Sequence, residues 1–122
     1  MQEIKETVET LTLARHAVDA AADKKAEHIL LLDLRGLSLV ADYFVICSAA
    51  TDRQLRAIAK NIDDVLRMEH SIRPHHIEGA DSGGWVLMDY GDLIVHAFTP
   101  SQRMHYNLEE LWAQAPVLLR MQ

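Results

Sequence analysis

The segment DYFVICSA, residues 42–49, constrains the fold more than any other stretch of the chain. It is rich in β-branched and aromatic residues, which favour β-strands. Its apolar residues do not alternate with polar ones, as they would in a strand with a single buried face. The segment is therefore predicted to be a central strand in a sheet that is covered on both faces.

The N-terminal half supplies helices and a second strand for such a sheet. Residues 3–22 are predicted to form an amphipathic helix, because apolar residues recur there at helical spacing. These residues are Ile4, Val8, Leu11, Ala14 and Val18. HILLLDL, residues 28–34, predicts a buried strand. Thr51 and Gln54 form a capping box at the start of a second helix, which runs to about His70.

The C-terminal half predicts a hairpin followed by a helix. RPHHIEG favours a short edge strand, and WVLMDY and LIVHAF on either side of Gly91 and Asp92 predict a β-hairpin. Thr99 is expected to cap a third helix, with Pro100 at its first position and Gln102 completing a second capping box. The apolar face of this helix is Leu108, Leu111 and Trp112.

The predicted order of elements is helix, two strands, helix, three strands and helix, with Pro116 limiting the last helix. This order predicts an α/β or α+β fold, in which a mixed sheet of about five strands packs with helices. A length of 122 residues fits a single domain that spans residues 1–122.

The charge distribution favours a basic protein partner over a nucleic acid. The net charge is −6, whereas nucleic-acid binding needs clustered Lys and Arg to replace counterions. Between His76 and Glu110 the acids outnumber the single base, Arg103; the acids are Glu78, Asp81, Asp89, Asp92, Glu109 and Glu110. Such a segment is expected to attract a basic protein. It is equally typical of an ordinary solvated surface.

Cysteine use and hydropathy predict a cytoplasmic protein without a membrane segment. The single cysteine, Cys47, excludes a disulfide within the chain and favours a reducing compartment. Its place in an apolar run predicts a core residue rather than a nucleophile. The N-terminus lacks the cationic start and apolar stretch of a signal peptide. No apolar run approaches the roughly 20 residues that span a bilayer.

The polar residues do not assemble a recognisable active site. Asp89 and Asp92 have the residue type for a two-carboxylate metal site, but Asp beside Gly is a common turn choice, and the turn is favoured. His75 and His76 should face opposite sides of a strand. The other histidines considered have no partner at ligand spacing, so no zinc site is expected. They are His16, His28, His70 and His105.

The strand that begins at Trp85 leaves two alternatives open. Alternation would place three side chains on each face: Trp85, Leu87 and Asp89 on one, and Val86, Met88 and Tyr90 on the other. An exposed aromatic strand face is typical of a protein interface. A sheet with helices on both faces would instead place Trp85 in the core.

Several segments carry a family resemblance. They are DYFVICSAATDRQLRAIAKNI, the pair Glu78-Gly79, GGWVLMDYGDLIVHAF, and the pattern R..Y.LE.LW from Arg103 to Trp112. Together they closely resemble the ribosomal silencing factor family, also called the Iojap-related proteins. The resemblance covers residues 3–116 in the family's order and spacing. One small departure is Ala49, where many relatives carry glycine.

The resemblance implies an α/β fold similar to nucleotidyltransferases and a non-enzymatic role without a cofactor. It implies binding to the large ribosomal subunit through its fourteenth protein (uL14), which blocks joining of the small subunit. Translation would thereby be repressed when nutrients are scarce. It also implies a homodimer when the factor is free.

The alternative function is a metal-dependent nucleotidyltransferase or another nucleotide-binding enzyme, supported by the fold likeness and by Asp33, Asp89 and Asp92. Fold likeness does not transfer activity, and the chain lacks the Gly-Ser turn of those enzymes. The hairpin is therefore expected to be a docking surface. The candidate partner-binding residues are Trp85, Leu87, Met88, Asp89, Tyr90, Arg103 and Tyr106.

Overall fold

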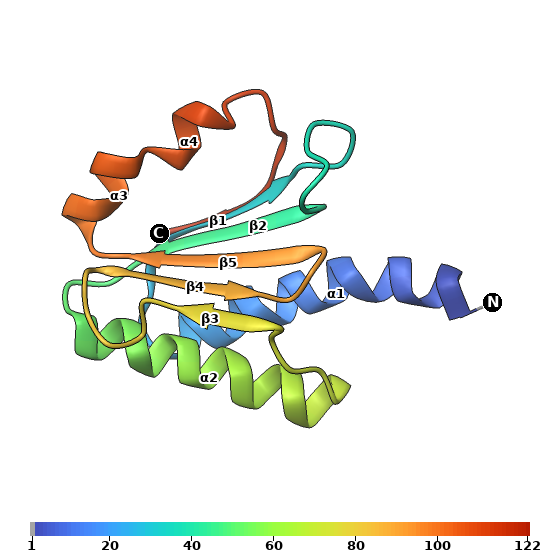
Figure 1. Cartoon of the computed structure of the whole chain (residues 1–122), viewed down its shortest axis with the longest axis horizontal. Coiled ribbons are helices and arrows are strands. Elements are labelled where there is room, and N and C mark those ends of the chain that lie inside the picture. The colour runs from blue at the N-terminus through green and yellow to red at the C-terminus, as the bar shows by residue number, and fades with distance from the viewer. Residues whose placement is uncertain (1) are drawn as a thin grey trace.

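A computed structural model describes residues 2–122, with side chains from Thr10 onward (Figure 1). The helices are α1 (Gln2–Asp23), α2 (Asp52–His70), α3 (Pro100–Tyr106) and α4 (Leu108–Leu111). The strands are β1 (Glu27–Asp33), β2 (Tyr43–Ser48), β3 (His76–Glu78), β4 (Trp85–Asp89), β5 (Leu93–Phe98) and β6 (Val117–Met121). The described residues form one six-stranded sheet in the order β3-β4-β5-β2-β1-β6. β2 and β5 run parallel and the other neighbours antiparallel, which confirms the predicted mixed sheet packed with helices.

The strand predicted to be central is β2. It lies between β1 and β5, and all of its side chains are buried. Burial raises the pKa of the Cys47 thiol to about 12, so this cysteine stays protonated and unreactive. The prediction of a strand covered on both faces is confirmed, and Cys47 is a core residue.

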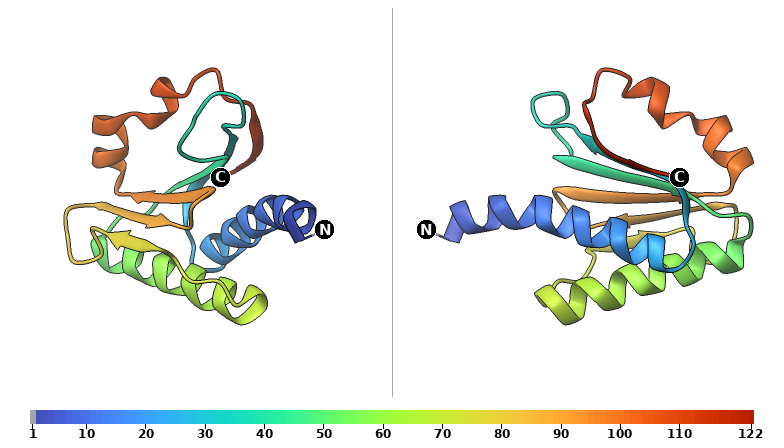
Figure 2. Two further views of the ribbon diagram at one scale, coloured as in Figure 1. Left: turned by 45° about the vertical axis from the view of Figure 1, so that its right-hand side comes forward. Right: turned by 180° about the vertical axis from the view of Figure 1, so that it is seen from behind.

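One face of the sheet is covered by α1 and α2 (Figures 1 and 2). α1 contributes small buried side chains, among them Ala14, Ala17 and Ala21, which allow close approach of its neighbours. The amide of Asn61 on α2 donates to the carbonyl of Ala20 on α1 at 2.8 Å. This bond satisfies a helical carbonyl and ties the two helices together.

Both ends of α2 follow from the sequence. Thr51 Oγ1 accepts a hydrogen bond from the Gln54 backbone amide at 3.1 Å, so the predicted N-cap is confirmed. The Gln54 side chain does not complete the predicted box, because its Nε2 donates to the Lys24 and Lys25 carbonyls at 3.4 and 3.3 Å. The helix ends at His70, as predicted, because Ser71 adopts a left-handed backbone with φ of 56°. Two positions of the predicted first helix, Ile4 and Val8, lie outside the described side chains. No helix in the described part of the chain is long and apolar enough to cross a bilayer.

The other face of the sheet carries α3 and α4 (Figure 1). The sequence predicted one helix here, whereas the structure divides it at Asn107, whose left-handed φ of 48° ends α3. The predicted second capping box is wrong. Thr99 stands at the N-cap without a side-chain capping bond, and Gln102 Nε2 donates instead to the Gly83 carbonyl at 3.1 Å.

β6 is not among the strands predicted from the sequence. This strand pairs antiparallel with β1, and most of its side chains are exposed at the edge of the sheet. Its sequence, VLLRM, shows no alternation, and it follows directly on Pro116, a residue whose local pattern indicates only the end of the preceding helix. Pairing with a distant strand, rather than a local pattern, therefore creates β6.

The predicted hairpin of β4 and β5 is confirmed, and its turn explains Asp89. The Asp89 Oδ1 atom accepts a hydrogen bond from the Gly91 amide at 2.7 Å. Gly91 has a φ of 89°, a conformation that glycine adopts without strain. The Tyr90 amide closes the turn on the Leu93 carbonyl at 2.9 Å. Asp89 is thus a turn residue, as the sequence favoured.

Candidate docking site

β4 sends alternate side chains to two unlike faces of the sheet. Val86 and Met88 are 2% and 1% exposed and lie in the core with α1 and α2; Tyr90, just beyond the strand, is also buried there. Trp85 and Leu87 point to the opposite face and are only partly buried. The predicted alternation is therefore confirmed. The prediction that Met88 and Tyr90 contact a partner is wrong, because helices cover their face.

Trp85 is the centre of an aromatic cluster that reaches from the sheet to solvent. Its ring stacks on Phe98 of β5 with centroids 5.1 Å apart. It also packs on Tyr106 of α3 with centroids 4.4 Å apart. Phe98 is fully buried, whereas Tyr106 is 46% exposed. Trp85 is therefore a rigid half-buried platform, which differs from both alternatives that the sequence left open.

His96 lies beneath Trp85 and holds the indole by a hydrogen bond. Trp85 Nε1 donates to His96 Nδ1 at 3.2 Å, so Nε2 carries the proton of the neutral ring. The imidazole is only 4% exposed, and this burial lowers the pKa of His96 to about 4. Nε2 has no hydrogen-bond partner among the described residues. The ring is consequently uncharged at neutral pH.

The exposed border of this cluster has an acidic edge. Leu87 pairs across the sheet with Glu78 of β3 on one side and His96 of β5 on the other. Directly opposed residues share a face, so Glu78 lies beside Leu87. Glu78 Oε2 also lies 2.9 Å from His76 Nε2. We call Trp85, Leu87, Asp89 and Tyr106 the β4 docking face; these are four of the seven predicted contact residues.

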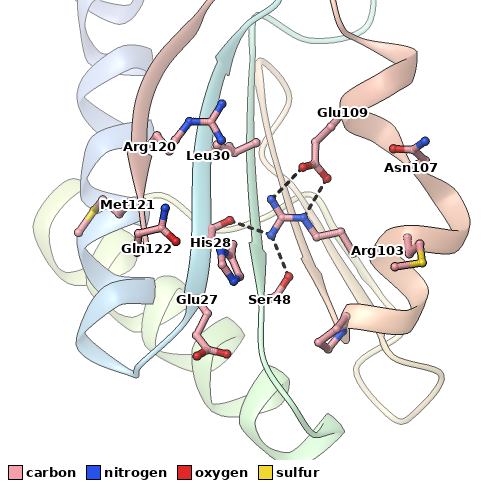
Figure 3. A pocket seen from close by; sticks show the side chains of 12 residues that line it. Glu27, His28, Leu30, Ser48, Arg103, Asn107, Glu109, Arg120, Met121 and Gln122 are labelled. Atoms are coloured by element: carbon pink, nitrogen blue, oxygen red, sulfur yellow. Dashed lines mark hydrogen bonds and ion pairs between the residues drawn. The ribbon is translucent and has the colours of Figure 1, made fainter.

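Arg103, another predicted contact residue, is directed into the protein (Figure 3). Its Nη1 donates to the His28 carbonyl at 2.7 Å and to Ser48 Oγ at 2.8 Å. Its Nε donates to Glu109 Oε1 at 2.9 Å, and the side chain is 12% exposed. It lines a pocket of about 430 Å³ between the sheet and α3. Because its charge is paired within the protein, Arg103 joins α3 to β1 and β2, and its contact with a partner stays a prediction.

The substitution Arg103→Ala is expected to lower the free energy of unfolding by about 2 kcal/mol, because the charged hydrogen bonds to Ser48, His28 and Glu109 are lost together. Urea denaturation of the purified variant measures this change. Arg35→Ala is the matched control. Arg35 forms the same bidentate pair with Asp33, at 2.9 and 2.8 Å, but the Arg35 side chain is 56% exposed. Equal losses in the two variants would show that the burial of Arg103 is irrelevant.

Two of the three carboxylates that favoured a nucleotidyltransferase serve other roles. Asp33 is held by Arg35, whose side-chain hydrogen bonds lower the pKa of this carboxyl. Asp89 caps its turn, and the side chain of Asp92 is exposed. Among the described side chains, the one group of three metal-ligand types within reach of one another lies elsewhere, on α1 and α2. The predicted carboxylates therefore do not converge on a metal.

Sequence reasoning missed two histidine arrangements. The prediction that His16 and His70 have no partner is wrong, because the fold brings His16 Nδ1 to 2.7 Å from His70 Nε2. No local pattern links residues so far apart in the chain. The contact between His96 and Trp85 could have been predicted from the sequence. The hairpin turn fixes the register that pairs Leu87 with His96, and Trp85 lies on the same face of the hairpin.

The family model described as "Ribosomal silencing factor during starvation" matches residues 6–121. The chain belongs to the ribosomal silencing factor family. The ribosomal silencing factor of Bacillus subtilis is 47% identical over 106 residues, which cover 87% of this chain and 89% of that protein. The chloroplastic Iojap protein of Zea mays is 33% identical over 115 residues, which cover 93% of this chain and 49% of that protein.

Solved structures agree with this family assignment. A crystal structure of a protein from Chromobacterium violaceum superposes with a TM-score of 0.81 at 30% identity, covering 84% of this chain and 85% of that one. A crystal structure from Bacillus halodurans gives a TM-score of 0.75 at 40% identity, covering 91% and 97%. The ribosomal silencing factor resemblance predicted from the sequence motifs is therefore confirmed at the level of family and of fold.

Proposed function

We propose that this silencing factor binds the large ribosomal subunit through its fourteenth protein and blocks joining of the small subunit, using the β4 docking face. Relatives across this family carry the name ribosomal silencing factor, which supports the ribosome as target. The mechanism is steric. A folded domain seated beside the intersubunit face excludes the other subunit and represses translation, without a cofactor or a catalysed reaction.

The two faces of β4 differ in exposure, and this difference supports the β4 docking face as the binding surface. The side with Val86 and Met88 is sealed by helices, whereas Trp85, Leu87 and Tyr106 keep apolar surface open to solvent. Aromatic side chains held rigidly at the centre of a patch are the usual anchors of protein interfaces. The hydrogen bond from Trp85 to buried His96 supplies that rigidity.

Charge at the border of the face supports a basic partner. Glu78 is exposed beside Leu87, and Asp89 is partly exposed within the face. Acidic groups around an apolar centre would speed encounter with a basic ribosomal protein and repel bare RNA. On this proposal the factor acts in the cytoplasm, where the two subunits meet. A homodimer of the free factor would use the same exposed apolar surface.

Leu87→Gln tests the surface. We expect about a tenfold or greater loss of affinity for purified large subunits, because a central apolar contact of the interface is replaced by an amide. Co-sedimentation over a range of concentrations measures the affinity. The same variant should restore subunit joining in a reconstituted assay. Denaturation of the same sample reports any loss of folded protein.

Ile77→Gln is the matched control. Ile77 is 40% exposed on neighbouring β3, but it pairs with Met88 and so lies on the opposite face of the sheet. The affinity of the Ile77→Gln variant for large subunits should stay within about twofold of the wild-type value, as expected for a residue outside the interface. Equal weakening by both variants would remove the β4 docking face from the proposal. Retention of the wild type on small subunits alone would overturn the function itself.

A further inference from the structure

A cluster of three side chains on the helical face of the sheet has no part in the proposed function. His16 projects from α1, and Glu69 and His70 project from the last turn of α2. His16 Nδ1 lies 2.7 Å from His70 Nε2 and 3.7 Å from Glu69 Oε2. The ligand atoms of all three lie within 4.8 Å of one another. The two helices pack side by side here, behind the sheet as seen from the β4 docking face (Figure 2).

We propose that His16, Glu69 and His70 form a binding site for a divalent transition metal ion of the zinc class. Two imidazole nitrogens and one carboxylate oxygen are a donor set that zinc accepts, with the fourth position left for water. Imidazole favours zinc, copper and nickel over magnesium or calcium, which prefer oxygen ligands. The residue types therefore select the class of metal.

The geometry requires only a small adjustment. Zinc–nitrogen bonds of about 2.0–2.1 Å in a tetrahedral site place two nitrogens roughly 3.3 Å apart. The two facing nitrogens are 2.7 Å apart, so the rings must separate by about half an ångström. Both histidines are partly exposed, and Glu69 is exposed, so their side chains can move. The separation of 3.7 Å from His16 to Glu69 already leaves room for an ion between them.

The proton balance is also simple. In the neutral pair one of the two facing nitrogens carries a hydrogen, which the other accepts. A metal takes the lone pair of both facing nitrogens, so this proton moves through solvent to the other nitrogen of the same ring. Each imidazole stays neutral, as metal ligation requires.

The surroundings favour a cation. A hollow of about 320 Å³ adjoins the cluster and is lined by His16 and Glu69 together with Asp19 and Asp23 of α1. Both aspartates are exposed, so the ion can enter from solvent past carboxylates that attract it. A metal held by His16 and His70 would join α1 to α2 across 54 residues of the chain. It would thus act as a clip between the two helices.

Isothermal titration of the untagged full chain with zinc chloride tests the proposal. We expect one ion per chain with a micromolar Kd. His16→Gln and His70→Gln should each weaken binding by at least about tenfold, since even the outer groups that support a metal ligand have effects of that size. His105→Gln, an exposed histidine on α3 at the other face, is the matched control and should bind zinc as the wild type does. Circular dichroism checks that each variant is folded.

A second measurement on the wild type keeps the test independent of any variant. Cobalt(II) in place of zinc should give the visible absorption of a four-coordinate site, and thermal unfolding should shift upward with zinc concentration. The absence of saturable zinc binding below about 0.1 mM, roughly the weakest affinity useful for a specific site, would overturn the proposal. So would binding that survives in both histidine variants. Ribosome binding through the opposite face is unaffected by either result.

Discussion

Gly79→Ala is expected to lower the free energy of unfolding by about 3 kcal/mol, combining a strained backbone with a collision in a tight space. Gly79 follows β3 with a φ of 78°, which disfavours any residue with a Cβ atom. A Cβ atom at this position would lie 1.9 Å from the carbonyl oxygen of Trp85 and 3.1 Å from its carbon. Since these are backbone atoms at the start of β4, the strand itself must move. The same variant should therefore also displace Trp85 and weaken docking.

Gly36→Ala separates the two causes. Gly36 has nearly the same φ, 81°, but a Cβ atom there would meet nothing within 4 Å. Its substitution should cost about 1 kcal/mol, the penalty of the left-handed backbone alone. Urea denaturation of both variants measures the difference. Equal losses of unfolding free energy in the two variants would show that the loop after β3 shifts at little cost. The close contact with the Trp85 backbone would then not contribute.

The stability of the protein is expected to fall by about 3 kcal/mol between pH 6.5 and pH 4 through His96 alone, since each unit of pKa difference is worth about 1.4 kcal/mol. Burial lowers the pKa of His96 from its usual 6.5 to about 4 in the folded state. As the pH falls below 6.5, the unfolded chain binds a proton at this ring and the folded chain does not. Unfolding is therefore favoured through this window. Above pH 6.5 the ring is neutral in both states and the contribution of His96 to stability is complete.

His96→Asn isolates this effect. The asparagine side chain places an acceptor near the position of Nδ1, so the bond from Trp85 can persist while the titrating group is removed. The measurement is the slope of unfolding free energy against pH for the variant and for the wild type. The variant should have the smaller slope between pH 6.5 and 4, whatever its absolute stability at pH 7.5. Parallel curves would mean that His96 is protonated as easily in the folded protein as in the unfolded chain.

Local patterns predicted the parts of the fold that depend on local chemistry. The unbroken apolar run of β2 required a position covered on both faces, and Thr51 with Gln54 required a helix start. β6 could not be predicted in this way, because its strand character comes from pairing with distant β1. The division of the predicted third helix at Asn107 could not be predicted for a related reason. A single residue in a left-handed conformation overrides an apolar pattern that continues across it.

In the candidate site, too, the features that depend on local sequence could be predicted, and those that depend on tertiary packing could not. Alternation along β4 correctly separated Trp85 and Leu87 from Met88, but only the position of the helices shows which face is open. Arg103 could not be distinguished from a surface arginine by sequence, because its partners His28 and Ser48 come from the first half of the chain. The meeting of His16 with His70 depends on helix packing in the same way.

The parallel pairing of β2 with β5 makes closing the sheet a non-local step in folding. β5 lies between β2 and β4, yet it is made only after α2, β3 and β4. Until β5 is made, β1 and β2 can pair only with each other, and the edge of β2 that pairs with β5 is left open. Closing the long crossover from Ser48 to Leu93 is a non-local step, and such steps are slow. The arrival of β5 both completes the sheet and brings His96 under Trp85, so the docking face forms only when the sheet closes.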